Sequence, residues 1–388
     1  MKKSLSETFL KDCEMYFSRE MNIPPAKPAM IILDITHRCN LKCAMCDISK
    51  DGFDPKKEFT SKEVFKIIDD MTDWGVKELV LSGGEALLRS DIFEILNYAR
   101  GKVNTGILTN GILIDDSVFK KIEPYLSEGS LSLTISLDGI NAKTHDFIRG
   151  KAGAFEKTTA LLKKLSDLKK KNPRVNFNVI SIILNANLEE LERIFKFVKS
   201  LSANTMQFQP LLPNNLRLEK RYLTSFWVPE SRYAVLDRVM DRIIAGKRQY
   251  PDFLVNSERD LHLVKKYFRR ELRPDEVKCY AIFKTMLISM DGKATACNTS
   301  YGNVRKQNLK EMWKSPEAAN SRRIIKNCAN PCLLPCFTDS RLYSLKGITA
   351  EFIRSSKKFS LAERKNEMMK AMKTLDSYRA ELENKHAL

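Results

Sequence analysis

The sequence predicts an α/β fold in which a partial (β/α)6 barrel precedes a small cysteine-rich domain and a helical tail. In the first half of the chain, apolar segments typical of strands alternate six times with segments of helical pattern. Such a series of β–α units indicates a parallel sheet covered by helices. The polar motifs of this region follow the predicted strands, and α/β barrels build their sites at the carboxyl ends of strands. Five of the nine cysteines return after residue 275 and indicate the second domain.

Five segments are expected along the 388 residues. They are an N-terminal extension (1–28), a core barrel (29–212), a helical connector (213–275), a cysteine-rich domain (276–340) and a helical basic tail (341–388). The strands of the core are expected at 30–36, 76–81, 103–109, 130–136, 174–184 and 205–209. The capping box Thr60-Ser-Lys-Glu63 predicts the start of a helix that runs toward Trp74, and Asp115 or Asp116 can cap a later helix. Other helices are expected at 91–100, 155–171 and 188–202.

The first strand leads into three closely spaced cysteines, Cys39, Cys43 and Cys46, in a C-x3-C-x2-C run. Three thiolates at this spacing can converge on one soft metal centre. A 4Fe–4S cluster takes four ligands, usually cysteines, so three ligands would leave one iron open to a substrate or cofactor. A structural zinc site with His37 as a fourth ligand, or buried free cysteines, are the alternatives.

The second strand ends in Ser82-Gly83-Gly84-Glu85. Two glycines let the backbone come close to a ligand, and Glu85 can bind an ammonium group. Together with the cysteine run, this motif resembles the radical S-adenosylmethionine (SAM) superfamily. The resemblance implies that the three cysteines are catalytic and hold a 4Fe–4S cluster, whose open iron chelates the amino and carboxylate groups of SAM. It also implies that Gly83, Gly84 and Glu85 contact the methionyl amino group.

Two residues depart from the pattern of this superfamily. Met45 stands where an aromatic residue is usual, and Ala86 stands where proline is frequent. Neither side chain is expected to touch a ligand.

A third set of motifs follows the fourth predicted strand. Ser136-Leu-Asp-Gly139, His145-Asp and Ile148-Arg149-Gly150 resemble the subgroup whose members carry SPASM or twitch extensions. By that likeness Ser136 would meet the ribose of SAM and Arg149 its carboxylate, while Thr109, Asn110 and Ile183 would line the cofactor pocket more loosely. The alternatives are a simple strand-ending turn at Thr109-Asn-Gly111 and a surface ion pair for Arg149.

The late cysteines form a second group: Cys279, Cys297, Cys328, Cys332 and Cys336. Met290-Asp-Gly-Lys293 predicts a two-residue type I′ hairpin that brings the first two cysteines toward one end. Their C-x12-G-x4-C spacing around Gly292 resembles the opening of twitch and SPASM domains, and the number of cysteines implies one auxiliary 4Fe–4S cluster. Structural zinc is the competing interpretation. Cys332 and Cys336 are the preferred pair of the last three, although spacing does not decide which one is spare.

The chain is strongly basic, with 66 Lys and Arg against 48 Asp and Glu and a net charge of +18. Such a field attracts anions, but no RNA-recognition signature accompanies it, so a nucleic-acid partner is not expected. The sequence contains neither an apolar stretch long enough for a transmembrane helix nor a secretory signal, which predicts a cytoplasmic protein. An apolar stripe in the tail, with Leu361, Met368, Met369, Met372 and Leu375, indicates a helix packed on the domain or one at a membrane surface.

The resemblance implies an enzyme that cleaves SAM reductively to a 5′-deoxyadenosyl radical, which takes a hydrogen atom from the substrate. The substrate is expected to be a small molecule or lipid, which can be anionic, and an electron donor such as flavodoxin or ferredoxin is implied. One auxiliary cluster would assist electron transfer or substrate binding. The alternatives are a peptide-modifying maturase, which the short segment before the barrel disfavours, and a non-catalytic iron–sulfur or zinc protein.

Overall fold

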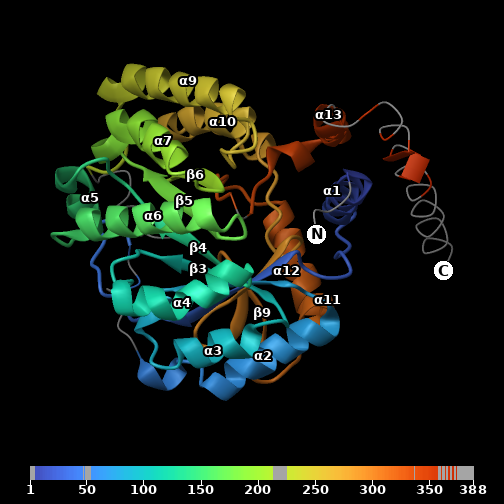
Figure 1. Ribbon diagram of the computed structural model, residues 1–388. Helices are drawn as coiled ribbons and strands as arrows, with labels where there is room; N and C mark the ends of the chain where they lie inside the picture. Colours follow the sequence, from blue (N-terminus) through green and yellow to red (C-terminus); the bar gives the residue numbers. More distant parts are fainter. Residues whose placement is uncertain are drawn as a thin grey trace.

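Nine strands form one sheet in the order β6-β5-β4-β3-β2-β1-β7-β8-β9. The computed structural model of the chain describes residues 5–46, 48, 54–212, 225–335, 337–356, 360, 363, 366, 367, 369, 370 and 373. Strands β1 to β6 run parallel to their neighbours. The sheet ends at β6 and β9 and does not close, which confirms the predicted partial barrel (Figure 1). The parallel strands are β1 Met30–Thr36, β2 Glu78–Gly83, β3 Asn104–Thr109, β4 Leu131–Ser136, β5 Asn176–Ile183 and β6 Thr205–Pro210.

Helices follow the core strands and cover the outer face of the sheet (Figure 1). Thr60 caps the first of them and forms the predicted capping box with Glu63. Asp115 caps α4 by accepting a hydrogen bond from the backbone N–H of Val118. The short helix α5 was not predicted from the sequence. These helices are α2 Ser61–Trp74, α3 Ile92–Ala99, α4 Asp116–Glu128, α5 Ala142–Arg149, α6 Ala154–Lys171 and α7 Leu191–Ser200.

The cysteine-rich segment extends the core sheet through a three-stranded antiparallel arm. Strand β7 (Thr285–Ile288) pairs in parallel with β1, and β8 (Lys293–Ala296) and β9 (Thr299–Asn303) follow antiparallel. The second domain is therefore built directly on the first strand of the barrel. Its first two cysteines flank the β7–β8 hairpin: Cys279 precedes β7, and Cys297 lies in the turn between β8 and β9.

The β7–β8 turn differs from the predicted two-residue type I′ turn. The N–H of Ser289 donates to the carbonyl of Lys293 (2.9 Å), and the N–H of Gly292 donates to the carbonyl of Ser289 (2.8 Å). Gly292 has a φ of +84°, whereas Asp291 is not among the residues with positive φ. A type I′ turn needs positive φ at both central residues, so the connection is instead a three-residue loop with glycine in the left-handed position.

The connector packs against the β6 edge of the sheet (Figure 1). Its middle segment runs beside β6, because the N–H of Met206 donates to the carbonyl of Phe253 and the N–H of Val255 donates to the carbonyl of Met206, each at 2.8 Å. The connector helices are α9 Tyr233–Gln249 and α10 Glu258–Arg269. In the described part of the chain, no helix combines the length and the apolar character needed to cross a bilayer.

The N-terminal helix α1 (Leu5–Glu20) lies beside the C-terminal region (Figure 1). The rings of Phe9 and Phe352 are 4.8 Å apart, which joins α1 to α13. Of the predicted apolar stripe in the tail, Met369 is described and is 58% exposed, and the other four residues lie outside the described part of the chain. The remaining helices are α11 Leu309–Lys314, α12 Pro316–Lys326 and α13 Leu345–Ser356. Short 3-10 helices occupy Pro55–Lys57, Ala86–Leu88, Asn185–Glu190, Glu230–Arg232, Pro274–Glu276 and Ser340–Tyr343.

Candidate functional site

A cavity of about 210 Å³ lies where the carboxyl ends of the parallel strands meet the first cysteine run. Nine of the eleven residues predicted around the cluster and cofactor line this cavity, although they come from five separate segments of the chain. They are Cys39, Cys43, Cys46, Gly83, Gly84, Thr109, Asn110, Ser136 and Arg149. Glu85 and Ile183 are not among its lining residues.

The two glycines after β2 allow a close approach between backbones. The N–H of Gly84 donates to the carbonyl of Thr36 (2.7 Å), and the N–H of Glu85 donates to the carbonyl of Arg38 (2.8 Å). A Cβ atom on Gly83 would lie 2.1 Å from the carbonyl oxygen of Thr36, and one on Gly84 would lie 2.2 Å from that of Arg38. Because only glycine fits at this distance, these residues fix the segment that leads into Cys39.

Helix α5 holds the cysteine run from the other side. The N–H of Ala44 donates to the carbonyl of Ile148 (2.9 Å). Gly150 ends the helix with a φ of +66°, and a Cβ atom there would lie 2.2 Å from the carbonyl oxygen of Lys42. The Ile148-Arg149-Gly150 motif therefore positions the chain next to Cys43 as well as presenting the Arg149 side chain.

Arg149 forms a buried ion pair rather than a surface one. Its Nη2 lies 2.5 Å from Oδ2 of Asp138, which is fully buried, and its Nη1 lies 3.9 Å from the sulfur of Cys43. Asp138 Oδ1 also accepts a hydrogen bond from the N–H of Ile182 (2.7 Å). The Nε of Arg149 is buried and has no hydrogen-bond partner among the described residues. Arg149 thus lines the cavity with its charge paired to Asp138 and one of its donors unpaired among the described residues.

His145 supports this pair and is held neutral. Its Nδ1 accepts a hydrogen bond from the backbone N–H of Asp138 (3.1 Å), which a protonated ring cannot do. Burial lowers the pKa of His145 to about 4, and the charge of Arg149 acts in the same direction. The His145-Asp motif therefore has a structural role beneath Arg149.

The cysteine thiols of the cavity fit a metal cluster better than a role as free nucleophiles. Burial raises the pKa of Cys39 and of Cys43, although Arg149 opposes the shift at Cys43. A thiol with a raised pKa is a poor nucleophile, whereas metal ions deprotonate a coordinating thiol. Three thiols and the unpartnered donor of Arg149 at one cavity match the requirements of a three-cysteine cluster with an anionic ligand.

Two of the predicted residues are not among those that line the cavity. Glu85 is fully buried, and its carboxylate accepts hydrogen bonds from Thr109 Oγ1 (3.0 Å) and from the N–H of Asn110 (2.9 Å). These hydrogen bonds secure the end of β3, and the predicted contact of Glu85 with the amino group of SAM remains a prediction. Ile183 faces the helices, because side chains alternate along a strand, and Ile180 and Ile182 line the cavity in its place.

Sequence reasoning also missed an apolar part of the wall. Met45, whose side chain was expected to be irrelevant to ligands, lines the cavity and is only 2% exposed. Leu41, Ile48 and Leu108 line the cavity beside it. The signal available for Met45 was its position between the second and third cysteines. Single apolar residues such as Leu41, Ile48 and Leu108 have no distinctive pattern in the sequence.

The late cysteines gather at a second place. Burial raises the pKa of Cys279 well above its usual value, and the thiols of Cys332, Cys297 and Cys328 are close enough to add to the shift. Burial likewise raises the pKa of Cys332 to about 11. No three described His, Cys, Asp or Glu residues, in either cysteine group, are arranged for a single metal ion. Cys336 lies outside the described residues, so the expected Cys332–Cys336 pair remains a prediction.

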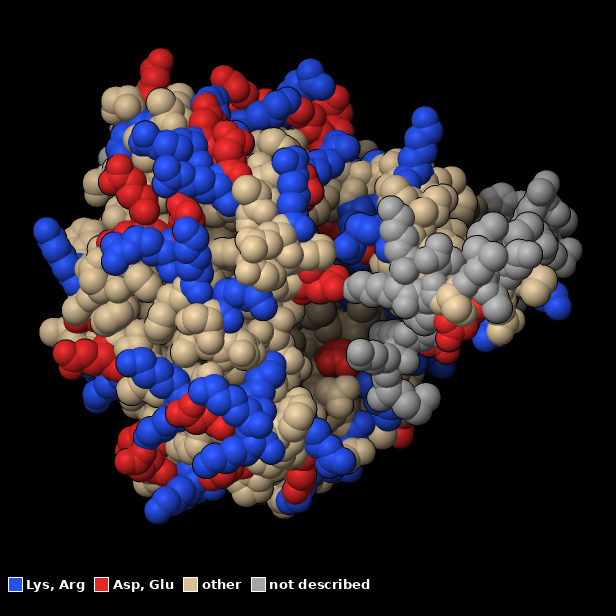
Figure 2. All heavy atoms as spheres, turned by 45° about the horizontal axis from the view of Figure 1, so that its top comes forward, with Lys and Arg blue, Asp and Glu red and all other residues tan. Residues whose placement is uncertain are grey.

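A larger cavity of about 790 Å³ lies between the connector, the end of the cysteine-rich segment and α13. Figure 2 shows this face hollowed, with acidic and basic side chains around the opening. Among the described residues it shares no lining residue with the smaller cavity. Its charged lining comprises the cations Lys247, Arg248, Arg259, Lys284, Arg341 and Arg354 and the carboxylates Glu258, Asp260, Asp339 and Glu351.

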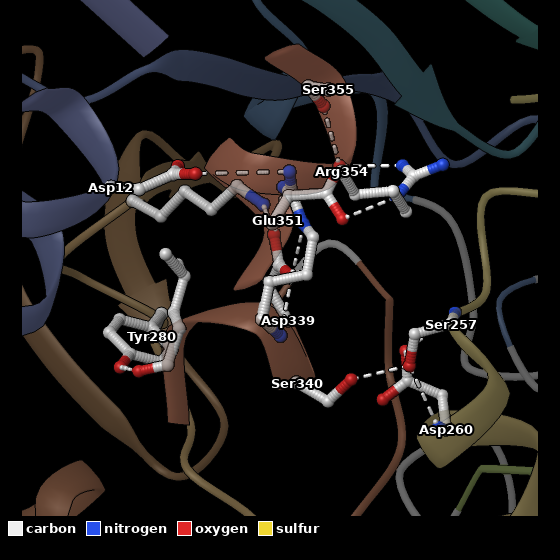
Figure 3. Close-up of polar contacts among 12 residues, drawn as sticks. Asp12, Ser257, Asp260, Tyr280, Asp339, Ser340, Glu351, Arg354 and Ser355 are labelled. Carbon is white, nitrogen blue, oxygen red and sulfur yellow. Dashed lines mark hydrogen bonds and ion pairs between the residues drawn. The ribbon is translucent and has the colours of Figure 1, made fainter. Parts of the chain in front are cut away.

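Most charges of this larger cavity are paired with one another. Arg354 binds Glu351 at 2.6 Å (Figure 3). Arg341 binds Asp339 at the same distance. Lys247 and Arg259 form no ion pair with any described carboxylate. Burial lowers the pKa of Lys247. Its Nζ donates to the backbone carbonyls of Pro251 and Leu254, each at 2.6 Å. The cavity thus has an excess of positive charge.

The fold and the cysteine-lined cavity define an iron–sulfur enzyme of the radical SAM type, and comparisons with known proteins agree. The model of the radical SAM superfamily matches residues 33–198, and that of the SPASM iron–sulfur cluster-binding domain matches residues 279–338. The chain therefore carries a radical SAM domain followed by a SPASM-type domain. The cofactors that go with these two models are a 4Fe–4S cluster with SAM in the first segment and auxiliary iron–sulfur in the second.

Individual relatives differ in what they make. The chain is 34% identical to an AdoMet-dependent heme synthase of Methanosarcina barkeri over 45% of its own length and 48% of that protein, so it spans about half of this relative. It is 28% identical to the Fe-coproporphyrin III synthase of the same organism over 83% of the chain and 84% of that protein. It is 26% identical to the subtilosin biosynthesis protein AlbA of Bacillus subtilis over 74% of the chain and 60% of that protein.

A solved structure shows the same fold. Streptococcus suis SuiB bound to S-adenosylmethionine superposes with a TM-score of 0.62, covering 81% of this chain and 75% of SuiB, at 16% sequence identity. At that identity the likeness concerns the fold alone.

Proposed function

We propose that Cys39, Cys43 and Cys46 hold the SAM-binding 4Fe–4S cluster and that SAM occupies the cavity of about 210 Å³ beside them. When bound, the cluster and SAM would supply the radical chemistry that removes a hydrogen atom from the substrate. The observation that carries this proposal is the convergence of nine predicted residues, from five segments of the chain, on one cavity. The late cysteines would hold an auxiliary cluster that assists electron transfer or substrate binding.

The residues around the cavity would divide the binding of SAM among them. The unpartnered Nε of Arg149 supports a contact with the carboxylate of SAM, and Ser136 would meet the ribose from the end of β4. Gly83 and Gly84 would act through the backbone, while Glu85 would position Thr109 and Asn110 through its hydrogen bonds. This indirect role adds to the ammonium contact expected for Glu85.

SAM cleavage tests the assignment of the cysteines. Anaerobically reconstituted protein should produce 5′-deoxyadenosine in the presence of dithionite, and replacement of all three cysteines by alanine should abolish the product. Cys13→Ala is a matched control, because this thiol is also buried (4% exposed) but lies on α1, outside the cavity. Undiminished cleavage in the triple variant would refute the assignment.

For the substrate, we propose an anionic small molecule, with a tetrapyrrole carboxylate as the leading candidate. The net charge of +18 and the cationic excess of the larger cavity both support an anionic ligand. A volume of about 790 Å³ lies within the usual range for ligand sites. The Fe-coproporphyrin III synthase, which matches over most of both chains, supports the tetrapyrrole.

The substrate proposal is tested by stimulation of SAM turnover. Iron tetrapyrroles with free carboxylates should accelerate formation of 5′-deoxyadenosine, and the tetrapyrrole that is the substrate should itself change in mass. The corresponding methyl esters, which lack the free carboxylates, should do neither. A peptide is the second candidate, because the chain also resembles the subtilosin biosynthesis protein AlbA over most of its length. Stimulation by the ester as strong as by the acid would refute recognition through carboxylates. A flavodoxin or ferredoxin would serve as the electron donor in either case.

A further inference from the structure

Helix α1 lies outside both segments that match the family models, yet its last turn reaches the second cysteine group. The side chain responsible is that of Arg19, which is only 6% exposed. A buried guanidinium is costly unless its donors are bound and its charge is compensated. The partners of Arg19 therefore indicate what the helix does at this place.

The guanidinium of Arg19 joins two cysteine-bearing segments. Its Nε donates to the backbone carbonyl of Cys279 (2.9 Å), and its Nη2 donates to the carbonyl of Lys326 (3.2 Å), two residues before Cys328. The guanidinium carbon also lies 5.7 Å from the centre of the Tyr280 ring. One rigid, planar group thus sets the spacing of backbone segments that are far apart in the sequence.

Positive charge exceeds negative charge around Arg19. Among the described residues, Glu20 is the carboxylate of this group, and it lies 3.4 Å from Arg19 and 2.7 Å from Lys278. Lys326 approaches the same turn by donating to the backbone carbonyl of Glu20. Three cations therefore share one carboxylate. A cluster bound by cysteine thiolates carries negative charge, and its potential depends on neighbouring charges, so this excess complements it.

We propose that Arg19 is a positioning residue of the auxiliary iron–sulfur cluster. It aligns the segments that carry Cys279 and Cys328, and its charge favours the reduced cluster, which is the more negative state. The inference rests on the proposed second cluster and is independent of the SAM reaction and of the substrate. Through Arg19, the N-terminal helix would contribute to the auxiliary cluster site, although the family models do not include this helix.

The experiment isolates the auxiliary cluster. In full-length protein with Cys39, Cys43 and Cys46 replaced by alanine, the remaining iron and its EPR signal would belong to the late cysteines. Arg19→Gln removes the charge, whereas Arg19→Lys keeps it and loses the fork of donors. Asp12→Asn is the matched control, because Asp12 lies on the same helix and pairs with Arg341 (3.9 Å) in the region of Figure 3.

A redox titration followed by EPR gives the decisive result. Arg19→Gln should lower the midpoint potential by about 59 mV or more, a tenfold change in the reduction equilibrium of a one-electron couple, and should lower the iron content. Arg19→Lys should restore most of the potential, and Asp12→Asn should leave both quantities unchanged. If Arg19→Gln holds no cluster, its potential cannot be measured, and the iron contents of Arg19→Gln, Arg19→Lys and Asp12→Asn then test the proposal.

Three results would overturn the proposal. The first is wild-type iron content and potential in Arg19→Gln, and the second is an equal loss of iron in Asp12→Asn, which would show that only the docking of the helix matters. The third is a potential in Arg19→Lys as low as in Arg19→Gln. Absence of any iron in the triple-alanine background would instead refute the auxiliary cluster itself, so the two failures are distinguishable.

Discussion

Alanine at Gly150 should disturb the first cysteine run, whereas alanine at Gly153 should not. Both glycines have left-handed backbones, with φ values of +66° and +76°. An L-residue in that conformation costs about 1–2 kcal/mol in either position. The positions differ in space: a Cβ atom on Gly150 would lie 2.2 Å from the carbonyl oxygen of Lys42, whereas one on Gly153 would meet nothing within 4 Å. Ordinary contacts begin at 3.4 Å, so the chain before Cys43 must move by about 1 Å.

Both variants should be destabilised by the backbone conformation, Gly150→Ala additionally by the displacement of the chain at Lys42, and Gly150→Ala should also lose function. A displacement of about 1 Å next to a reacting centre can reduce a rate about 100-fold. Gly150→Ala should cleave SAM about 100-fold more slowly and should lose part of the iron of the first cluster. Gly153→Ala should keep the cleavage rate and the iron content of the wild type. Urea unfolding, iron analysis and 5′-deoxyadenosine formation are the measurements. Equal iron content and equal cleavage in the two variants would show that α5 does not position the cysteines.

Two further predictions concern the residues beneath the cavity. Arg149→Ala should raise the Kd for SAM about 10- to 100-fold through loss of a charge-assisted hydrogen bond of about 1.5–3 kcal/mol. It should also cost about 3–5 kcal/mol of stability, because Asp138 is left unpaired. The double variant Arg149→Met with Asp138→Asn should restore stability but not affinity, and an unchanged affinity of Arg149→Ala in calorimetric titration would contradict this prediction. The pKa of His145 is lowered from 6.5 to about 4 in the folded protein. The stability that neutral His145 contributes is therefore fully present above pH 6.5 and is lost progressively as the pH falls from 6.5 to 4. By pH 5 the loss should be about 2 kcal/mol, measured by urea unfolding, and His145→Asn, which keeps an acceptor, should not show it.

The barrel was predictable because its signals are local. Six alternations of strand and helix patterns define the parallel sheet, and the capping box at Thr60 marks one helix start to the residue. Helix α5 was missed because its eight residues carry a mixture of charged and apolar side chains, and its position depends on contacts with the distant cysteine run. The pairing of β7 with β1 joins residues more than 200 positions apart, and no local pattern shows such a contact.

The site was predictable in its membership but not in its geometry. Motif spacing brought nine residues to one cavity, yet it could not tell that Glu85 faces the end of β3. On β5, Ile180 and Ile182 line the cavity whereas Ile183 does not, because a shift of one residue exchanges the two faces of a strand. Arg19 gave no signal at all, since a single arginine in a charged helix has no distinctive pattern before its buried partners are known.

The response of the EPR spectrum to SAM tests the central claim most directly. If Cys39, Cys43 and Cys46 hold a cluster with an open iron, addition of SAM to the reduced wild-type protein should change the cluster signal. In the variant with these three cysteines replaced by alanine, the signal of the late cysteines should remain and should not respond to SAM. A wild-type spectrum that SAM does not change, or a SAM response that persists in the variant, would contradict the assignment of the SAM site to the end of the parallel strands.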